Sequence, residues 1–282
     1  MTTDPRAARR LHQAIEPYHG MIYFVPEGPQ HYAAIKLDGT PMMGYFASRS
    51  AAMGAVGAEV VIATFFNFHP DLVRAAIPAA WERATPGQAG LARLTAVDEA
   101  LRRMLGSRLG DDDVVEVAAL TRRAAEACTS PGRPLYAAHA QIDWPDEAHL
   151  QLWHAATLLR EFRGDGHIAC LVEQGIDPCE VLVIHAASGP GAPSRRALQG
   201  SRQWSDEEWA AATERLVVRG WLDADGALTD SGRASRTHVE DRTDELAAPT
   251  WGVLDEGEQQ RVVDVGRELS QTIIEAGTFG RR

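Results

Sequence analysis

Lysine is nearly absent from this sequence: of 28 basic residues among 282, only Lys36 is a lysine and 27 are arginines. GC-rich coding produces such a bias as readily as selection for phosphate contacts, so the arginines alone do not indicate a nucleic-acid partner. Positive charge is also in deficit, because 39 acidic residues give a net charge of −11 at pH 7. This charge repels polyanions on average, and a nucleic-acid role therefore requires a local basic patch.

Cysteine and long apolar runs are scarce as well. The three cysteines, Cys128, Cys170 and Cys179, include no C-x-x-C pair, which excludes a disulfide framework and favours buried thiols. The sequence has no N-terminal segment with the features of a signal peptide and no window of about eighteen uninterrupted apolar residues. We therefore expect a cytoplasmic protein with no membrane partner.

The common motifs of catalysis and cofactor binding are missing. No Walker or Rossmann glycine pattern, G-x-S-x-G elbow, H-E-x-x-H zinc motif or EF-hand loop occurs in the sequence. The usual nucleotide and hydrolase chemistries lose support, and we expect no cofactor.

Helical periodicity dominates what is present, and it favours a mainly α fold. A first helix over residues 6–17 is expected to stop at Pro17, and the acidic run 111–113 caps a helix that continues to Ala127. The apolar segment 58–68 is read as a helix because a lone strand there has no partner. Two further helices are predicted over residues 71–80 and 91–105.

Three prolines make residues 131–149 the best linker candidate. This divides the chain into an N-terminal helical domain, 1–130, and a C-terminal domain, 150–282. In the second domain we expect a helix from residue 150 to a stop at Gly164, a new helix capped by Asp165, and a third that begins at Asp177.

The segment QWSDEEWAAATERLVVRGWLDADGALTDSGRA carries the strongest local signals. Ser205 and Glu208 form a capping box at a helix start, and Gly220 stands where that helix is expected to end. Residues 221–228 then predict a β-hairpin with its turn at Asp225-Gly226, followed by a helix that runs to Pro249. The predicted fold is a helical body with a winged-helix C-terminal domain (helix, β-hairpin, helix).

The segment RGWLDADGALTDSGR resembles the recognition helix and wing of MarR-like winged-helix regulators, and the resemblance covers roughly residues 200–247. Over most of its length the chain is similar to a family of actinobacterial helix-turn-helix proteins of unassigned function. Two segments carry this similarity: GYFASRSAAMGAVGAEVVIATFFNFHP and LWHAATLLREFRGDGHIA. The MarR-like resemblance implies a DNA-binding homodimer that responds to small molecules, although a fold does not guarantee a function.

Charge argues against DNA binding by this module. Residues 195–242 hold eight basic and nine acidic side chains, and the presumed recognition helix opens with Asp206-Glu207-Glu208 at its phosphate-facing end. DNA is therefore a disfavoured partner. If it binds, the candidate contacts are Arg195, Arg196, Arg202 and Arg215.

The densest polar cluster spans residues 160–167. Arg160 and Arg163 can hold a carboxylate or phosphate, while Asp165 orients His167 as a general acid or base. The alternative is structural: Asp165 caps a helix, the arginines pair with nearby acids, and His167 is a partly buried helix residue.

A second candidate region lies in the N-terminal half, where aromatic residues and methionines surround one cation. Tyr45, Phe46, Met53 and Phe66 can line a cavity for an apolar or aromatic ligand whose anionic end is fixed by Arg49. The same residues can equally form core, but a buried Arg49 then needs a partner.

Two further possibilities were weighed. His167, Cys170, Cys179 and His185 can ligate zinc, but burial explains the cysteines more simply, so no metal is expected. Four tryptophans can form a dimer interface: Trp204, Trp209, Trp221 and Trp251.

The function that these features favour is a winged-helix protein that binds a small apolar or aromatic, anionic ligand, as in a ligand-responsive transcriptional regulator. The alternative is an enzyme of small-molecule metabolism that uses the Arg/Asp/His cluster.

Overall fold

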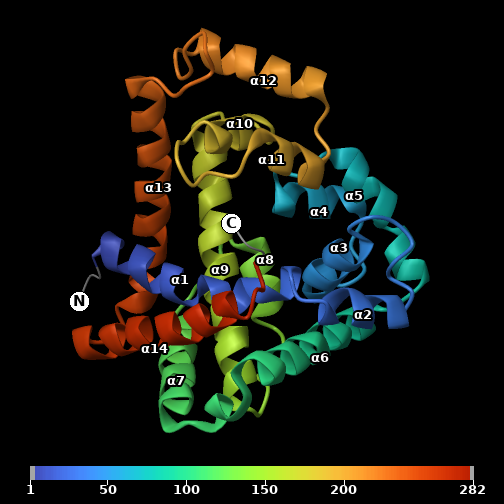
Figure 1. The fold of residues 1–282 in the computed structure, drawn as a ribbon, viewed down its shortest axis with the longest axis vertical. Helices are drawn as coiled ribbons and strands as arrows, with labels where there is room; N and C mark the ends of the chain where they lie inside the picture. The colour runs from blue at the N-terminus through green and yellow to red at the C-terminus, as the bar shows by residue number, and fades with distance from the viewer. Residues whose placement is uncertain (1–3, 280–282) are drawn as a thin grey trace.

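The computed structural model describes residues 4–279, and over these residues the protein is mainly helical with no strand (Figure 1). The α-helices are α1 (Pro5–Gly20), α2 (Glu27–Ala34), α3 (Met43–Ser50), α4 (Ala58–Phe65), α5 (Pro70–Ala76), α6 (Pro86–Leu105), α7 (Asp112–Glu126), α8 (Pro134–His139), α9 (Ala148–Glu173), α10 (Glu180–Ala186), α11 (Arg195–Arg202), α12 (Asp206–Val218), α13 (Asp230–Trp251) and α14 (Glu256–Glu275). Short 3-10 helices occur at η1 (Met21–Tyr23), η2 (Ala51–Met53), η3 (Ala79–Glu82) and η4 (Gly106–Gly110).

The predicted start of the helix that follows Ser205 is confirmed, and so is its predicted end. The Ser205 side chain accepts from the Glu208 amide, and the Glu208 carboxylate accepts from the Ser205 amide, which is the complete capping box at the start of α12. Gly220 adopts φ +72° just after this helix, as expected of a helix terminator. The ambiguous segment 58–68 is helical as α4, and the acidic run 111–113 precedes α7.

Two predicted helix ends are wrong. Helix α1 does not stop at Pro17 but continues to Gly20, because Tyr18 and His19 in its last turn are buried against α9. The helix predicted over 71–80 ends at Ala76, and a separate 3-10 turn follows.

The predicted stop at Gly164 and the predicted cap at Asp165 are also wrong, since α9 is one unbroken helix of 26 residues. Gly166 is needed for close approach and not for termination: a Cβ there would lie 1.9 Å from Nη1 of Arg133. Asp165 instead caps α8, because its Oδ2 accepts from the backbone N–H groups of Leu135 and Tyr136, both at 3.0 Å.

Helix α9 is the central element, and α1, α7, α8 and α13 pack around it. Its buried residues lie on nearly every side of the helix, which explains why it shows no clear amphipathic stripe. Figure 1 shows α9 and α13 running side by side from the main body up to α10, α11 and α12.

Three hydrophobic clusters fill the interior. The main cluster joins α1, α6, α7, α9 and α14, and includes residues from Ala8 to Ile273. A second cluster lies among α2 to α6 and holds Phe46 and Phe68. The third, the C-terminal cluster, joins the end of α9 to α10, α11, α12 and the start of α13, with Trp209 and Trp221 inside it.

The proline-containing segment 131–149 is ordered on the protein. It forms α8, whose Leu135 and Tyr136 are buried, and α8 packs against α9. The division into separately folding units, 1–130 and 150–282, stays a prediction.

The predicted β-hairpin is not formed. Residues 221–228 make one antiparallel bridge, Leu222 with Leu228, and no ladder. The Asp223 carboxylate accepts from the amides of Asp225 and Ala227, which closes a tight loop, and Thr229 already caps α13. The chain therefore returns to helix before strands can extend, and the C-terminal domain is helical with a single-bridge loop where a wing was expected.

No single helix within residues 4–279 is both long and apolar enough to cross a membrane. One bent pair, Met43–Met53 with Ala58–Phe65, meets the length and composition criteria together, with a bend of 93°. Phe46 and Val61 of this pair are fully buried in the second cluster.

Candidate functional site

A polar cavity of about 260 Å³ lies between α1, α3, α9, α11 and the turn that joins α4 to α5. We call it the arginine cavity. Seven of the catalytic and ligand-binding candidates from the sequence line it: Tyr45, Arg49, Phe66, Arg160, Arg163, Asp165 and His167. The two regions suspected separately, the aromatic segment and the 160–167 cluster, thus meet in one place.

Two other predicted ligand residues do not line this cavity. Phe46 is fully buried in the second hydrophobic cluster, and Met53 packs against that cluster from η2. Both positions agree with the alternative weighed for these aromatic residues and methionines, namely that they form core.

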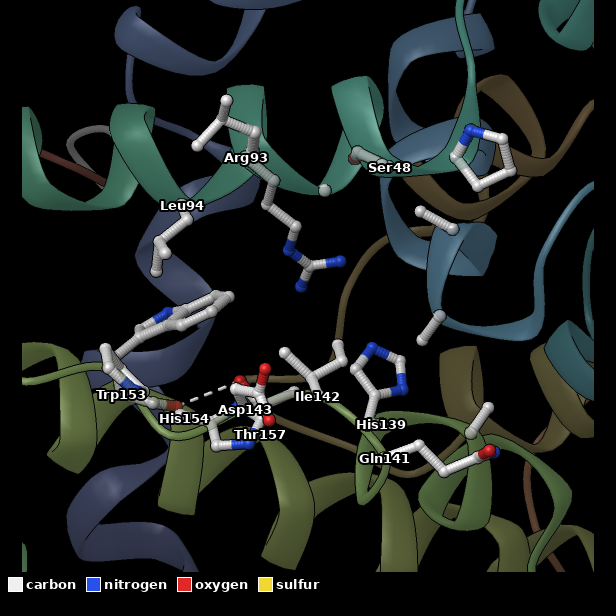
Figure 2. A pocket seen from close by; sticks show the side chains of 18 residues that line it. Ser48, Arg93, Leu94, His139, Gln141, Ile142, Asp143, Trp153, His154 and Thr157 are labelled. Atoms are coloured by element: carbon white, nitrogen blue, oxygen red, sulfur yellow. Dashed lines mark hydrogen bonds between the residues drawn. The ribbon is translucent and has the colours of Figure 1, made fainter.

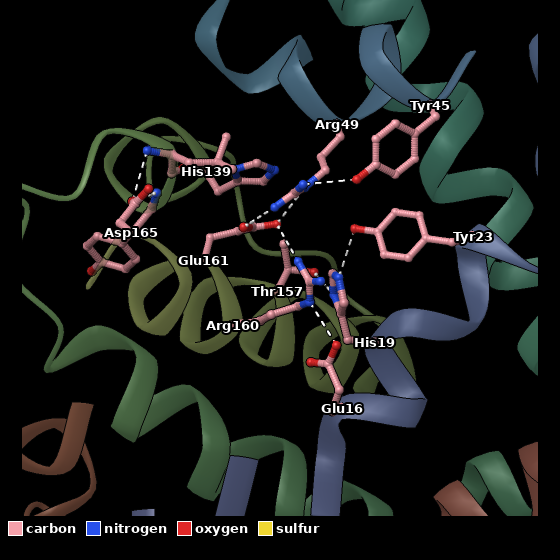
Figure 3. Close-up of polar contacts among 12 residues, drawn as sticks. Glu16, His19, Tyr23, Tyr45, Arg49, His139, Thr157, Arg160, Glu161 and Asp165 are labelled. Carbon is pink, nitrogen blue, oxygen red and sulfur yellow. Dashed lines mark hydrogen bonds and ion pairs between the residues drawn. The ribbon is translucent and has the colours of Figure 1, made fainter. Parts of the chain in front are cut away.

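Arg49 has a buried carboxylate partner, as expected for a cation in an apolar segment. Its Nη2 and Nε donate to the two carboxylate oxygens of Glu161 at 2.7 and 3.1 Å, and its Nη1 donates to the Tyr45 hydroxyl at 3.0 Å (Figure 3). Glu161 is only 1% exposed. Burial opposes its ionisation, but the guanidinium groups of Arg49 and Arg160 outweigh this and hold the Glu161 pKa below its usual range.

The remaining arginines of the 160–167 cluster are also paired. Arg160 donates to Glu16 on α1 at 2.9 Å and to Glu161 at 3.3 Å. Arg163 donates to Asp244 on α13 at 2.9 Å. The arginines therefore tie α9 to α1, α3 and α13.

Arg202 differs from the other arginines on the cavity wall. It reaches the cavity from the end of α11, and its guanidinium lies 4.6 Å above the ring of Phe68. Within residues 4–279 it forms no ion pair, and its best side-chain contact outside α11 is a 3.4 Å hydrogen bond to Asn67. Burial, with repulsion from Arg49, lowers the pKa of Arg202. Arg202 and Arg49 are thus neighbouring cations, and of the two only Arg49 has a carboxylate partner among the described residues.

Asp165 and His167 both line the cavity, but their side chains form hydrogen bonds with different helices. Asp165 caps α8, and burial raises the pKa of its carboxyl to about 6. Nδ1 of His167 bonds the Thr243 hydroxyl on α13 at 3.0 Å. Residues two apart on a helix do not face each other, and no hydrogen bond joins this pair in the described structure. Their catalytic role stays a prediction.

Buried histidines give the protein a predictable acid sensitivity. Burial lowers the pKa of His154 to about 4, and its Nε2 has no hydrogen-bond partner within residues 4–279. A depressed histidine pKa means that the unfolded chain binds the proton more tightly, so stability is complete above about pH 6.5 and is lost as the pH falls towards 4. The His154→Phe variant keeps the edge-on contact with Trp144 and removes the titration.

We expect the wild type to lose about 2 kcal/mol more than His154→Phe in free energy of unfolding between about pH 7 and about pH 5. Urea denaturation at the two pH values measures this difference. His238→Gln, a histidine replacement at an exposed position of α13, is the control variant. Equal pH dependence of wild type and His154→Phe would contradict the assignment.

The arginine cavity lies next to a helix-turn-helix unit. Helices α11 and α12 are joined by a short turn in which Gln203 adopts φ +61°. Residues 66–69, the α4–α5 turn, contact this unit: the His69 amide donates to the Arg202 carbonyl at 2.9 Å, and the Trp204 indole donates to the Asn67 carbonyl at 3.0 Å. The same turn lines the cavity through Phe66, Asn67 and Phe68.

The other three candidate DNA contacts also lie on this unit, and they differ in whether an acidic side chain pairs with them. Arg215 pairs with Asp177 and with Glu180, and Arg195 pairs with Asp206. Arg196 is exposed and forms no ion pair in the part of the chain that the structure describes. The DNA role of these three arginines stays a prediction.

Three of the four tryptophans considered as a possible dimer interface are core residues. Trp209 and Trp221 are buried in the C-terminal cluster and Trp251 in the main cluster. Trp204 is partly buried through its contact with the α4–α5 turn.

The potential zinc ligands weighed in the sequence do not gather into a metal-binding group among the described residues. Three other residues, Asp98, Glu147 and His149, do lie close enough to share an ion. Arg102 already bridges Asp98 and Glu147, at 2.9 and 2.5 Å, so this group is an ion-pair network.

Glu161, the residue that organises the cavity, is not among the residues predicted from the sequence. A signal was available: Thr157, Glu161 and Asp165 follow one another at intervals of four residues, which places three polar side chains on one face of the helix. Arg202, in contrast, reaches the cavity only because α11 packs on the α4–α5 turn, and no local pattern predicts that.

Comparison with curated proteins and with solved structures finds no match. Residues 8–280 match a protein family whose description is "Helix-turn-helix family". This match covers nearly the whole chain, including both the arginine cavity and the α11–α12 unit, and the chain therefore belongs to the helix-turn-helix family.

Proposed function

We propose that this protein is a ligand-responsive helix-turn-helix regulator in which a small anionic molecule binds in the arginine cavity. The observation that carries the proposal is Arg202, a half-buried cation without a carboxylate partner in the described structure, on the wall shared by the cavity and α11. An anion between Arg202 and Arg49 relieves the repulsion between them and adds charge-assisted hydrogen bonds. The aromatic rings of Phe66 and Phe68 beside it suit an apolar or aromatic body.

The α4–α5 turn is the element through which binding can act. Phe66 in this turn has φ +57° and ψ −65°, a strained backbone that costs on the order of 1–3 kcal/mol. The turn is held there by contacts to the α11–α12 unit, including the 3.0 Å bond between Nε2 of His69 and Glu208. A ligand that favours one arrangement of the turn therefore also favours one position of α11 and α12.

DNA is the partner that the helix-turn-helix geometry suggests, with α12 as the recognition helix. Its exposed start is acidic, so affinity must come from the arginines on neighbouring elements and must be strongly salt-dependent. The MarR-like resemblance supports a homodimer that works in the cytoplasm, and both features belong to the proposal.

Native mass spectrometry of the purified protein tests the ligand part. We expect a retained small anion in the wild type and its loss in Arg202→Met, with binding weakened about 10-fold or more. Arg196→Met is the matched control, because Arg196 lies on the same helix but is exposed and outside the cavity. Retention of the same ligand by Arg202→Met would contradict the proposed site.

A low-salt mobility-shift assay with DNA from upstream of the protein's own gene tests the regulatory part. We expect Arg196→Met to weaken the shift and Arg202→Met to remove its response to the ligand. Binding of DNA that no ligand alters, or no DNA binding at low salt, would refute regulation by this route.

A further inference from the structure

A second cavity of about 390 Å³ opens between α3, α6, α8 and α9. Its walls are mostly apolar and include Ala52, Leu94, Ile142 and Trp153. We call it the Arg93 cavity. Figure 2 shows the side chain of Arg93 extending from α6 into the space between Trp153 and His139.

Arg93 is a buried cation without a counter-ion. The residue is 4% exposed, and within residues 4–279 no carboxylate forms an ion pair with it. Its Nη2 donates to the Tyr23 hydroxyl at 3.0 Å, while Nε and Nη1 have no hydrogen-bond partner. The rings of Tyr23 and Trp153 lie 5.4 and 5.3 Å from the guanidinium carbon and stabilise the charge without neutralising it.

The other titratable groups on the cavity wall do not supply the missing charge. His139 and His154 are buried, and burial lowers the pKa of each to about 4, so both are neutral near pH 7. Nδ1 of His139 donates to the Leu135 carbonyl at 2.8 Å, which leaves Nε2 as an acceptor. Asp143 is exposed at the rim and forms no ion pair with Arg93 in the described structure.

A buried guanidinium without a carboxylate partner, at the end of an apolar cavity, is a positive charge that nothing compensates. A water molecule can satisfy an N–H group, but only an anion compensates the charge. A carboxylate matches the planar geometry of the guanidinium, and the apolar walls with Trp153 match a flat hydrophobic body.

We propose that the Arg93 cavity binds a small monocarboxylate with an aromatic or compact apolar body, whose carboxylate pairs with Arg93. This site is separate from the arginine cavity, and the two share no lining residue. The buried Arg49–Glu161 pair stands between them, since Ser48 and Thr157 face the Arg93 cavity while Arg49 and Glu161 face the other.

Isothermal titration calorimetry with benzoate as the probe tests this inference. We expect wild-type protein to bind benzoate and the Arg93→Met variant to bind it at least about 10-fold more weakly. Benzamide, which has the same ring and no charge, should bind the wild type as weakly as benzoate binds Arg93→Met.

Gly90→Leu provides an independent test that does not alter the charge. Gly90 lines the cavity from the second turn of α6, and a Cβ built there meets nothing within 4 Å. Leucine also favours a helix over glycine by roughly 0.8 kcal/mol, so the variant should fold while its side chain fills the cavity. We expect it to lose benzoate binding.

Gly90 and Arg93 line only the Arg93 cavity, so these two variants separate it from the arginine cavity. The inference is overturned if wild type and Arg93→Met bind benzoate equally, or if Gly90→Leu binds it as wild type does. No benzoate binding to wild type at millimolar concentration would overturn it as well.

Discussion

Replacing Glu161 with glutamine is expected to lower the free energy of unfolding by about 3–5 kcal/mol. The substitution preserves the shape of the side chain but leaves the guanidinium of Arg49, which is buried on a shared wall of α3 and α9, without its carboxylate partner. Arg160 loses one of its two acceptors at the same time. Urea denaturation near pH 7 measures the loss.

Two further variants separate the buried pair from surface electrostatics. Glu16→Gln removes the other carboxylate of Arg160, but the Glu16 side chain is 35% exposed, so we expect a loss of less than about 1 kcal/mol. The double variant Arg49→Met with Glu161→Leu removes both charges together and should be more stable than Glu161→Gln. A loss in Glu161→Gln no larger than in Glu16→Gln would show that the buried pair does not stabilise the fold.

Replacing Gly232 with alanine is expected to destabilise the C-terminal cluster by about 1–3 kcal/mol or more. A Cβ at Gly232 would lie 2.1 Å from the carbonyl oxygen of Trp221 and 3.0 Å from Cδ2 of Leu228, and the first of these atoms belongs to the backbone. The loop with the Leu222–Leu228 bridge must therefore move away from the first turn of α13. Thermal unfolding and hydrogen exchange of the amides in α12 measure the effect.

Gly200→Ala is the matched control for this substitution. Gly200 lies on α11 in the same unit, and a Cβ there meets no atom within 4 Å. Alanine should be neutral or stabilise the helix by up to about 1 kcal/mol. If Gly232→Ala were as stable as Gly200→Ala, the close packing of the loop on α13 would be refuted.

The sequence predicted best those elements whose signals are local. The capping box at Ser205 involves residues within one helical turn and is present, and the acidic run at the start of α7 likewise marks a helix start, although Asp111 makes no capping hydrogen bond through its side chain. Errors occurred where a distant contact overrode local propensity. Gly164 has the residue type of a helix stop, but α9 is buried on nearly every side, and packing holds it helical through that point.

The candidate site shows the same division. The sequence indicated that Arg49 needs a partner, because a cation in an apolar segment must be compensated, and it indicated the polar character of residues 160–167. It could not indicate that these two regions meet, since Arg49 and Glu161 are separated by 112 positions in the chain. Arg93 was missed although it stands on the buried face of α6, four residues after Ala89 and four before Val97, because only the arrangement of α8 and α9 isolates it from carboxylates.

The composition of the main hydrophobic cluster has a consequence for synthesis of the protein. This cluster draws on both α1 and α14, and these two helices pack against each other although they stand near opposite ends of the described chain. A ribosome-bound chain therefore carries the apolar faces of α1 and α9 uncovered until residues near Ile273 have emerged. A chain truncated before α14 should therefore aggregate and not form a smaller folded unit.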